Sequence, residues 1–275
     1  MLYMIHDGHI HTPYCPHGST DSLQSYVEEA VRNGFQRLTF TEHAPLPEGF
    51  QDPVPDQDSA MRKKDLPYYI GEIQKLKQFY RKDIEILTGL EIDFIEGYEA
   101  QTADFLREIG PELDDAVLSV HFLRSGSGYT CLDFDEHAFR HLKEYFGSLE
   151  NLYSDYYRTV RKSITSDLGA YKPKRIGHIT LVRKFQKLFP RTFVDTKMIR
   201  DVLDTAAAEG CSLDINTAGL RKRHCREIYP PLPFVKEAAS RGIPLTFGSD
   251  AHQSGDVGAD YEQISEYVEK HRFPE

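Results

Sequence analysis

The fold is decided by a strand followed by a helix, a unit that the chain repeats from end to end. The first unit is LYMIHDGHIHTPYCPHGSTDSLQSYVEEAVRN, residues 2–33. Leu2–His11 is predicted as a β-strand, and Asp21–Asn33 has the apolar spacing of an amphipathic helix. A second strand, Arg37–Glu42, follows and leads directly into His43. Because strand–helix–strand units join parallel neighbours, the pattern predicts an α/β fold.

The same alternation continues along the 275 residues, which suffice for one large domain, here taken as residues 1–275. Further strands are predicted at Glu85–Phe94, Asp115–Leu123, Arg175–Thr180, Cys211–Asn216 and Pro244–Asp250. Further helices are predicted at Lys64–Lys82, Tyr98–Ile109, within Glu136–Leu168, at Asp195–Glu209 with Asp195 as its cap, at Leu232–Ser240 and at Asp260–His271. Seven such units favour a closed or nearly closed β/α barrel, with an open doubly wound sheet as the alternative.

Composition narrows the class of protein. The formal net charge of −10 argues against a protein that holds nucleic acid by neutralising its phosphates. The sequence has no apolar run near the ~20 residues that span a bilayer, and Met1–Asp7 lacks the basic start of a secretory signal. No two cysteines form a C-x-x-C pair, so a reducing, cytoplasmic location is expected. The cysteines are Cys15, Cys131, Cys211 and Cys225.

Side chains that bind metals gather at the ends of the predicted strands. His9 and His11 are two residues apart on a strand, which points both imidazoles to the same face. Asp250 and His252 repeat that spacing. The carboxyl ends of the strands form the active-site face of parallel α/β barrels, so these side chains are predicted to converge on one pocket. The candidate ligands are His9, His11, His17, His43, Glu91, His121, His178, Asp250 and His252.

Seven histidines, one glutamate and one aspartate exceed the ligands that a single ion needs. They suit two or three divalent ions with a bridging carboxylate, and an imidazole-rich set favours Zn, Fe or Mn over Mg or Ca. An isolated histidine on an apolar strand is more often a hydrogen-bonded core residue, but such residues would not collect at one end of the strands. Cys15, two residues before His17, could be a soft ligand or a free thiol near a turn.

These motifs resemble those of the PHP (polymerase and histidinol phosphatase) superfamily, in order and over nearly the whole chain. The branch that the chain resembles most is the monofunctional PHP-type histidinol-phosphate phosphatases, through loop stretches at residues 7–12, 215–222 and 227–230. The motifs are His9-Ile10-His11, His17, Thr41-Glu42-His43, Gly89-Leu90-Glu91, Ser119-Val120-His121, Gly177-His178 and Ser249-Asp250-Ala251-His252.

The resemblance implies a distorted (β/α)7 barrel with three metal ions at the C-terminal strand ends. It also implies hydrolysis of a small phosphomonoester, specifically L-histidinol phosphate to L-histidinol plus phosphate, in histidine biosynthesis. Carried over by motif, the first ion would be held by His9, His11, Glu91 and Asp250. The second would be held by the bridging Glu91 with His121 and His178, and the third by His17, His43 and His252.

Three of the metal-site residues are predicted to take part in catalysis, namely Asp250, Glu91 and His252. Bound ions would neutralise the phosphoryl oxygens in the transition state and make water a better nucleophile. Asp250 is the candidate for orienting that nucleophile or relaying a proton. Pure ligation by Asp250 is the alternative.

Arginines are expected to complete a phosphate site because guanidinium groups can contact phosphate in a bidentate manner. Arg221 is the first candidate and Arg183 the second, with Arg223 next to Arg221 on the same loop. Asn216 ends a predicted strand and could contact the substrate. A surface position is the alternative for each arginine.

Three other functions remain open from the residues alone. The first is a PHP-type phosphoesterase for another small phosphate or a nucleotide, or a nuclease, which the acidic charge disfavours. The second is an amidohydrolase-like enzyme, but no lysine stands at a strand end to bridge metals. The third is a non-catalytic metal-binding module, which the intact ligand set argues against. The expected partner is a small phosphorylated substrate, without nucleic acid or membrane, and the sequence indicates no oligomeric state.

Overall fold

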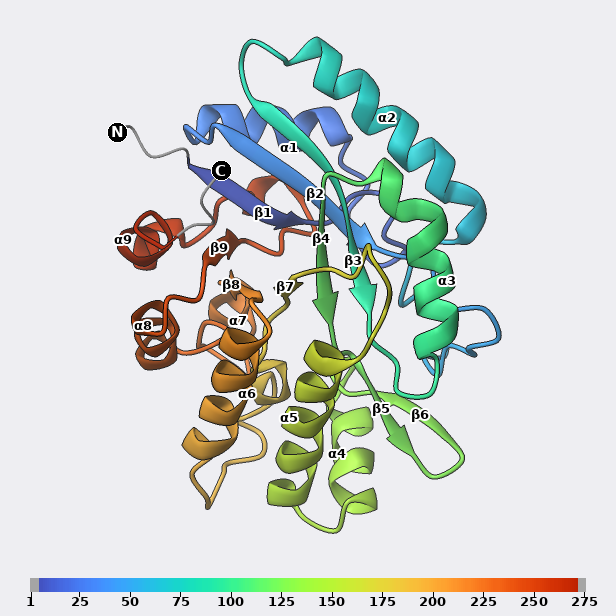
Figure 1. The fold of residues 1–275 in the computed structure, drawn as a ribbon, viewed down its shortest axis with the longest axis vertical. Helices are drawn as coiled ribbons and strands as arrows, with labels where there is room; N and C mark the ends of the chain where they lie inside the picture. Colours follow the sequence, from blue (N-terminus) through green and yellow to red (C-terminus); the bar gives the residue numbers. More distant parts are fainter. Residues whose placement is uncertain (1–4, 272–275) are drawn as a thin grey trace.

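Seven parallel strands form the centre of the protein in a computed structural model that describes residues 5–271 (Figure 1). Strands that are neighbours in the sheet also follow one another along the chain, as repeated strand–helix units require. The predicted residues Leu2–Met4 lie outside the described residues. In sheet order the strands are β1 (His6–Ile10), β2 (Arg37–His43), β3 (Glu85–Asp93), β4 (Asp115–Ser119), β7 (Arg175–Ile176), β8 (Ser212–Asn216) and β9 (Leu245–Gly248).

The two outer strands of the sheet, β1 and β9, meet and nearly close the barrel. Ile10 forms a parallel bridge with Ala251, and the His11 amide donates to the Ala251 carbonyl at 2.9 Å. Across the same seam, the buried Asp7 carboxylate accepts from the amides of Ser249 at 3.0 Å and Gly258 at 2.9 Å. The barrel prediction is therefore confirmed, and the open doubly wound sheet is excluded.

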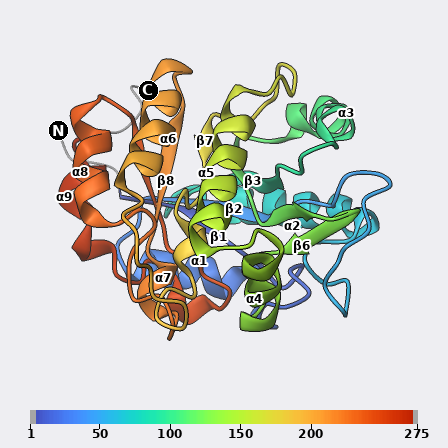
Figure 2. The ribbon, with the colours of Figure 1, turned by 90° about the horizontal axis from the view of Figure 1, so that it is seen from below.

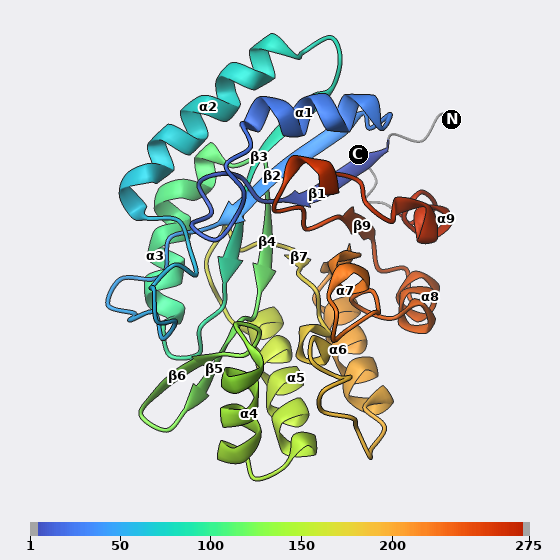
Figure 3. The same ribbon diagram turned by 180° about the vertical axis from the view of Figure 1, so that it is seen from behind.

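The helices surround this ring of strands, with α1 and α2 at one end of the view and α4 and α5 at the other (Figures 1 and 3). α5 and α6 lie side by side in both the front view and the view from below (Figure 2). The helices are α1 (Leu23–Arg32), α2 (Leu66–Phe79), α3 (Glu99–Ile109), α4 (Glu136–Tyr145), α5 (Leu149–Thr165), α6 (Thr196–Ala208), α7 (Ala218–Arg221), α8 (Leu232–Ser240) and α9 (Ser265–Val268).

Helix α1 shows why these segments become helical and pack on the barrel. Its N-cap is Ser22, whose hydroxyl accepts a hydrogen bond from the Ser25 amide at 3.2 Å. Leu23, Tyr26 and Val27 recur at helical spacing and are buried against the core. Burial of this one face fixes the helix beside the first strand, and the connecting segment at residues 11–22 is left at the carboxyl end of the barrel.

Several predicted elements differ from the structure. The predicted strand Asp115–Leu123 ends at Ser119, and the chain then forms an antiparallel hairpin outside the barrel, β5 (Phe122–Ser125) and β6 (Gly128–Cys131). The closing helix expected at Asp260–His271 is reduced to a 3-10 turn and the short α9. Asp260 adopts a positive φ of 64°, which interrupts a helix at that point.

Asp195 stands at the N-cap position of α6, as predicted, but it does not cap the helix with its side chain. Its carboxylate instead accepts from the Arg183 guanidinium at 2.6 Å and 3.0 Å. A buried arginine competes successfully for this carboxylate because both groups would otherwise lose water without compensation. Among the described residues, no helix is both long and apolar enough to cross a membrane.

Candidate metal centre

The carboxyl ends of the strands bring the nine predicted ligands to one side of the barrel. Seven of these ligands line a cavity of about 370 Å³, which is large enough for a small metabolite. His9 lies within β1, and His11 follows directly after that strand; both are fully buried. The seven that line the cavity are His17, His43, Glu91, His121, His178, Asp250 and His252.

The lining includes neither His9 nor His11, the other two predicted ligands. β2 supplies His43 and β3 supplies Glu91. His121, His178 and the Asp250–His252 segment follow β4, β7 and β9 respectively. Residues far apart in the sequence therefore meet because each stands at the same end of its strand, as the strand-end pattern predicted.

Glu91 is at the middle of the cluster. One carboxylate oxygen, Oε1, lies 2.9 Å from His178 Nε2 and accepts from the Ser119 hydroxyl at 2.5 Å. The other, Oε2, lies 3.1 Å from His43 Nδ1 and 3.4 Å from His9 Nε2. Burial by itself would raise the pKa of Glu91, but the surrounding histidines hold that pKa well below its usual value. Glu91 is thus held as a carboxylate with imidazoles on both oxygens.

The donor atoms of the cluster fit divalent ions. Buried polar atoms usually have hydrogen-bond partners, yet five buried atoms of this cluster make no hydrogen bond, although His43 Nδ1 and His9 Nε2 lie close to Glu91 Oε2. Two groups have ligand atoms that all lie within 4.8 Å of one another, His9–His11–Asp250 and Glu91–His121–His178. These groups match the first two ion sites that the resemblance implies. The five atoms are His9 Nε2, His11 Nε2, His43 Nδ1, Glu91 Oε2 and His178 Nδ1.

The far ring nitrogens of three histidines are held by buried carboxylates. His9 Nδ1 lies 2.9 Å from Asp214 Oδ2, and His121 Nδ1 lies 2.7 Å from Asp93 Oδ1. His11 Nδ1 lies 3.3 Å from Glu42 Oε1. Carboxylates in this position fix the ring orientation and leave the other nitrogen free to bind a metal. The sequence analysis did not single out these carboxylates, although Asp93 has the same two-residue spacing from Glu91 that marked the histidine pairs.

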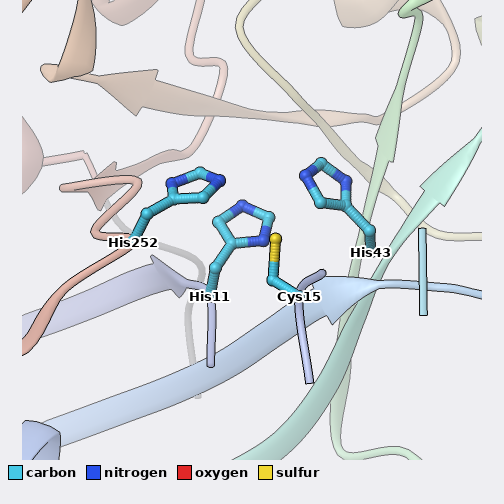
Figure 4. Close-up of side chains that lie close together, drawn as sticks. All are labelled: His11, Cys15, His43 and His252. Atoms are coloured by element: carbon cyan, nitrogen blue, oxygen red, sulfur yellow. The ribbon is translucent and has the colours of Figure 1, made fainter. Parts of the chain in front are cut away.

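A third group lies beside the first two and includes a thiol. His11, Cys15, His43 and His252 have ligand atoms within 4.8 Å of one another (Figure 4). The ring of His17 lies beside this group, with its centroid 5.3 Å from that of His43 and 5.4 Å from that of His252. His17 Nδ1 donates to the Asp58 carbonyl at 2.9 Å. The other ring nitrogen, Nε2, is then the one that could bind a metal ion.

The PHP domain family matches residues 7–218, which is most of the chain. This chain belongs to the PHP domain family. A Bacillus subtilis relative of this PHP protein, named histidinol-phosphatase, is 52% identical over 262 residues, covering 94% of this chain and 98% of the relative. That degree of identity extends over nearly the full length of both proteins.

Solved structures give this PHP protein the same fold. A Listeria monocytogenes protein assigned as a histidinol phosphatase is 38% identical, with a TM-score of 0.90 over 94% of this chain and 99% of that one. A Lactococcus lactis histidinol phosphate phosphatase, solved with Zn, L-histidinol and phosphate, is 17% identical, with a TM-score of 0.69 over 98% and 95%. The second likeness shows the fold alone.

The arginines predicted to bind substrate in this PHP protein do not line the cavity. Arg183 is buried, and its guanidinium is held by Asp195 and by Glu227 at 3.0 Å. Arg221 donates to the Ser249 carbonyl at 2.6 Å and lies 3.4 Å from Asp260. Both guanidinium groups are thus engaged by protein partners, and their role as phosphate ligands stays a prediction.

The other two predicted substrate contacts are also placed elsewhere. Arg223 is exposed and does not line the cavity. Asn216 is buried and donates to Asp250 Oδ2 at 3.1 Å, so it contacts a metal-site residue instead of the cavity. The lysines that line the cavity are Lys184 and Lys222, each one residue beyond a predicted arginine. The sequence analysis did not single out these two lysines, which lie on the same loops as the predicted arginines.

Proposed function

We propose that this PHP protein is a histidinol-phosphatase, which hydrolyses L-histidinol phosphate to L-histidinol and phosphate. The observation that carries this proposal is the 52% identity to the B. subtilis histidinol-phosphatase over nearly the full length of both chains. The cavity supports it independently, because ligands for divalent ions and two lysines surround a space suited to a small anion. Histidine biosynthesis is the pathway in which such an enzyme acts.

The nine residues of the metal centre would hold two or three divalent ions. His9, His11 and Asp250 would hold one ion, and Glu91 would bridge it to a second ion on His121 and His178. His17, His43 and His252 would hold the third. Such ions would neutralise the phosphoryl oxygens and make water a better nucleophile. An imidazole-rich set suits Zn, Mn or Fe, and zinc is the metal in the L. lactis structure.

Side chains of this protein would bind and orient the phosphate ester. Lys222 lines the cavity together with Asp250 and His252, which places a positive charge where phosphate oxygens would lie. Lys184 is held by Asp133, through Nζ contacts of 2.6 Å to its carbonyl and 2.9 Å to its carboxylate. We therefore assign phosphate binding to Lys222 first, with Lys184 as a pre-positioned charge.

Asp250 is the residue that we assign to proton handling. Its Oδ1 lies 3.2 Å from His11 Nε2, and its Oδ2 accepts from Asn216 at 3.1 Å. Burial would raise the pKa of Asp250, but hydrogen bonding to His11 and the nearby histidines hold that pKa well below its usual value. A carboxylate oriented in this way can align an attacking water and accept its proton, which is then available to the leaving alcohol.

The rest of the cavity suits the histidinol part of the substrate. Phe122, Phe134 and Tyr229 give it aromatic walls that can pack against an imidazole ring. Asp133 also lines it and carries negative charge near the expected ammonium group of the substrate. Free cysteines agree with a reducing location, and we propose a cytoplasmic enzyme whose partner is this small molecule.

The proposal is tested by a substrate panel on protein of known metal content. We expect the highest kcat/KM for histidinol phosphate among sugar, nucleotide and aryl monophosphates, and little cleavage of bis(p-nitrophenyl) phosphate. Faster turnover of another monophosphate would assign the protein to a different branch of the PHP family. Faster cleavage of the diester than of every monoester would overturn phosphomonoesterase activity itself.

A further inference from the structure

Cys15 lies among metal-binding side chains although no ligand role is assigned to it above. Its side chain is only 2% exposed, and its sulfur belongs to the group with His11, His43 and His252. Figure 4 shows the thiol pointing toward the space between the rings of His11 and His43. Cys15 therefore lies next to two of the histidines, His43 and His252, that would hold the third ion.

Two ring nitrogens beside this thiol have no hydrogen-bond partner in the described structure. They are His43 Nδ1 and His11 Nε2, and both histidines are more than nine-tenths buried. A buried imidazole nitrogen without a partner is costly unless a cation or a water completes its coordination. His43 Nδ1 lies 3.1 Å from Glu91 Oε2 and His11 Nε2 lies 3.2 Å from Asp250 Oδ1, so imidazole nitrogens and carboxylate oxygens crowd together next to the thiol, as they would around bound cations.

The turn that carries Cys15 fixes the position of its side chain; burial raises the pKa of the thiol, and two backbone amides of the turn act against that rise. The backbone N–H groups of His17 and Gly18 interact with the Cys15 side chain. Gly18 also donates to the Cys15 carbonyl at 3.1 Å, and a Cβ at Gly18 would lie only 3.2 Å from the Cys15 Cβ. Successive N–H groups aimed at one atom stabilise an anion there. The tight turn thus holds the sulfur in place beside the histidines, and direct coordination to a cation would be what deprotonates it.

We infer that Cys15 is a fourth ligand of the ion held by His17, His43 and His252. The sulfur–metal bond forms as the thiol gives its proton to solvent, so the ion keeps its charge state and the site gains one negative charge. The histidines alone are neutral, so this charge would tighten the site. A thiolate also favours Zn²⁺, Co²⁺ and Cd²⁺ over Mn²⁺. The inference rests on the proposed metal dependence but not on the identity of the ester.

The test uses Co²⁺ as the probe on the full-length protein without substrate. Thiolate ligation to Co²⁺ produces an intense charge-transfer band in the near ultraviolet, which imidazole and carboxylate ligands do not produce. We expect this band in the wild-type protein and its loss in Cys15→Ser, with far-ultraviolet circular dichroism unchanged. For the third metal equivalent, the ratio of Zn²⁺ affinity to Mn²⁺ affinity should be at least tenfold lower in Cys15→Ser than in the wild-type protein.

A matched variant keeps the test decisive if Cys15→Ser fails to fold. The triple substitution Cys131→Ser, Cys211→Ser and Cys225→Ser leaves Cys15 as the only thiol, and it should keep the band. Absence of the band in fully loaded wild-type protein, its persistence in Cys15→Ser or its loss in the triple variant would overturn the inference. Because no ester is present, none of these results depends on whether histidinol phosphate is the substrate.

Discussion

Lys222 lines the cavity, whereas Arg221 and Arg223 on either side of it do not. The Arg221 guanidinium is held by the Ser249 carbonyl and lies near Asp260, and Arg223 is exposed. Successive residues of a loop point in different directions, so a shift of one position separates a cavity charge from a surface charge. We therefore expect phosphate recognition in this loop to depend on Lys222.

Replacing Lys222 by alanine should lower kcat/KM for histidinol phosphate by more than tenfold, or about 1.4 kcal/mol of transition-state binding. The reason is the loss of a positive charge beside the phosphoryl group. Steady-state kinetics on metal-loaded protein measures the effect. Arg223→Ala is the matched control and should change kcat/KM by less than about twofold; equal losses in both variants would remove Lys222 from this role.

At the scale of residues, sequence patterns predicted where the histidines gather but did not single out the lysines that line the cavity. His9 and His11 obey the two-residue period of a strand, and that period sets which face they share. Lys184 and Lys222 lie in irregular loops, where no period fixes direction. Glu42 and Asp214 were missed because a carboxylate that holds a histidine ring is recognised only when the ring is seen beside it.

Arg183 and Asp195 connect the segment after β7 to the start of α6. Both side chains are almost fully buried, and Tyr157 also donates to Asp195 at 2.9 Å. Burial would raise the pKa of Asp195, but hydrogen bonds and charge from Arg183, with Arg191, lower that pKa overall. The pair therefore holds two elements of the barrel together and has no contact with the cavity.

Asp195→Asn should lower the free energy of unfolding at neutral pH by about 3 kcal/mol, because it leaves the Arg183 charge buried without its partner. A carboxyl group whose pKa is lower in the folded state stabilises the folded protein at pH values above its unfolded pKa of roughly 4. This contribution is lost as the pH falls through the pKa of the folded state. The difference between wild type and variant should therefore shrink in acid. Urea unfolding at several pH values measures it, and a difference that does not change with pH would contradict the assignment.

At the scale of elements, the alternation of strands and helices was predictable, and the ends of elements were less so. β3 and α3 lie close to their predicted ranges because their apolar spacing is regular. The β5–β6 hairpin was missed because Asp115–Leu123 reads as one apolar run, whereas Val120 and His121 separate two strands. The C-terminal segment lost its predicted helix where Asp260 adopts a positive φ.

Across the whole molecule, the metal centre joins strands that are distant in sequence. Its ligands come from β1, β2 and β3 and from the segments after β4, β7 and β9. The seam between β1 and β9, where the barrel closes, lies beside His9 and Asp250 through a 2.8 Å backbone hydrogen bond. Bound ions would thus link the two outer strands of the sheet, β1 and β9, to the rest of the barrel.

Removal of metal should therefore lower the thermal stability of the whole domain. Ions at about 100 times their Kd stabilise a protein by about 2.7 kcal/mol per independent site. We expect chelation to lower Tm by at least about 5 °C, with recovery when zinc is restored. Differential scanning calorimetry measures the change, and a Tm that chelation leaves unaltered would show that the ions do not support the barrel.

Metal titration of histidinol phosphate hydrolysis tests the central claim most directly. Metal-free protein should be inactive, and activity should return as zinc is added, only after more than one equivalent is bound per chain. Glu91→Gln, which removes the bridging charge, should stay inactive at every zinc concentration while remaining folded. Undiminished hydrolysis by metal-free protein, or full activity of Glu91→Gln, would contradict a metal-dependent phosphatase built on this cluster.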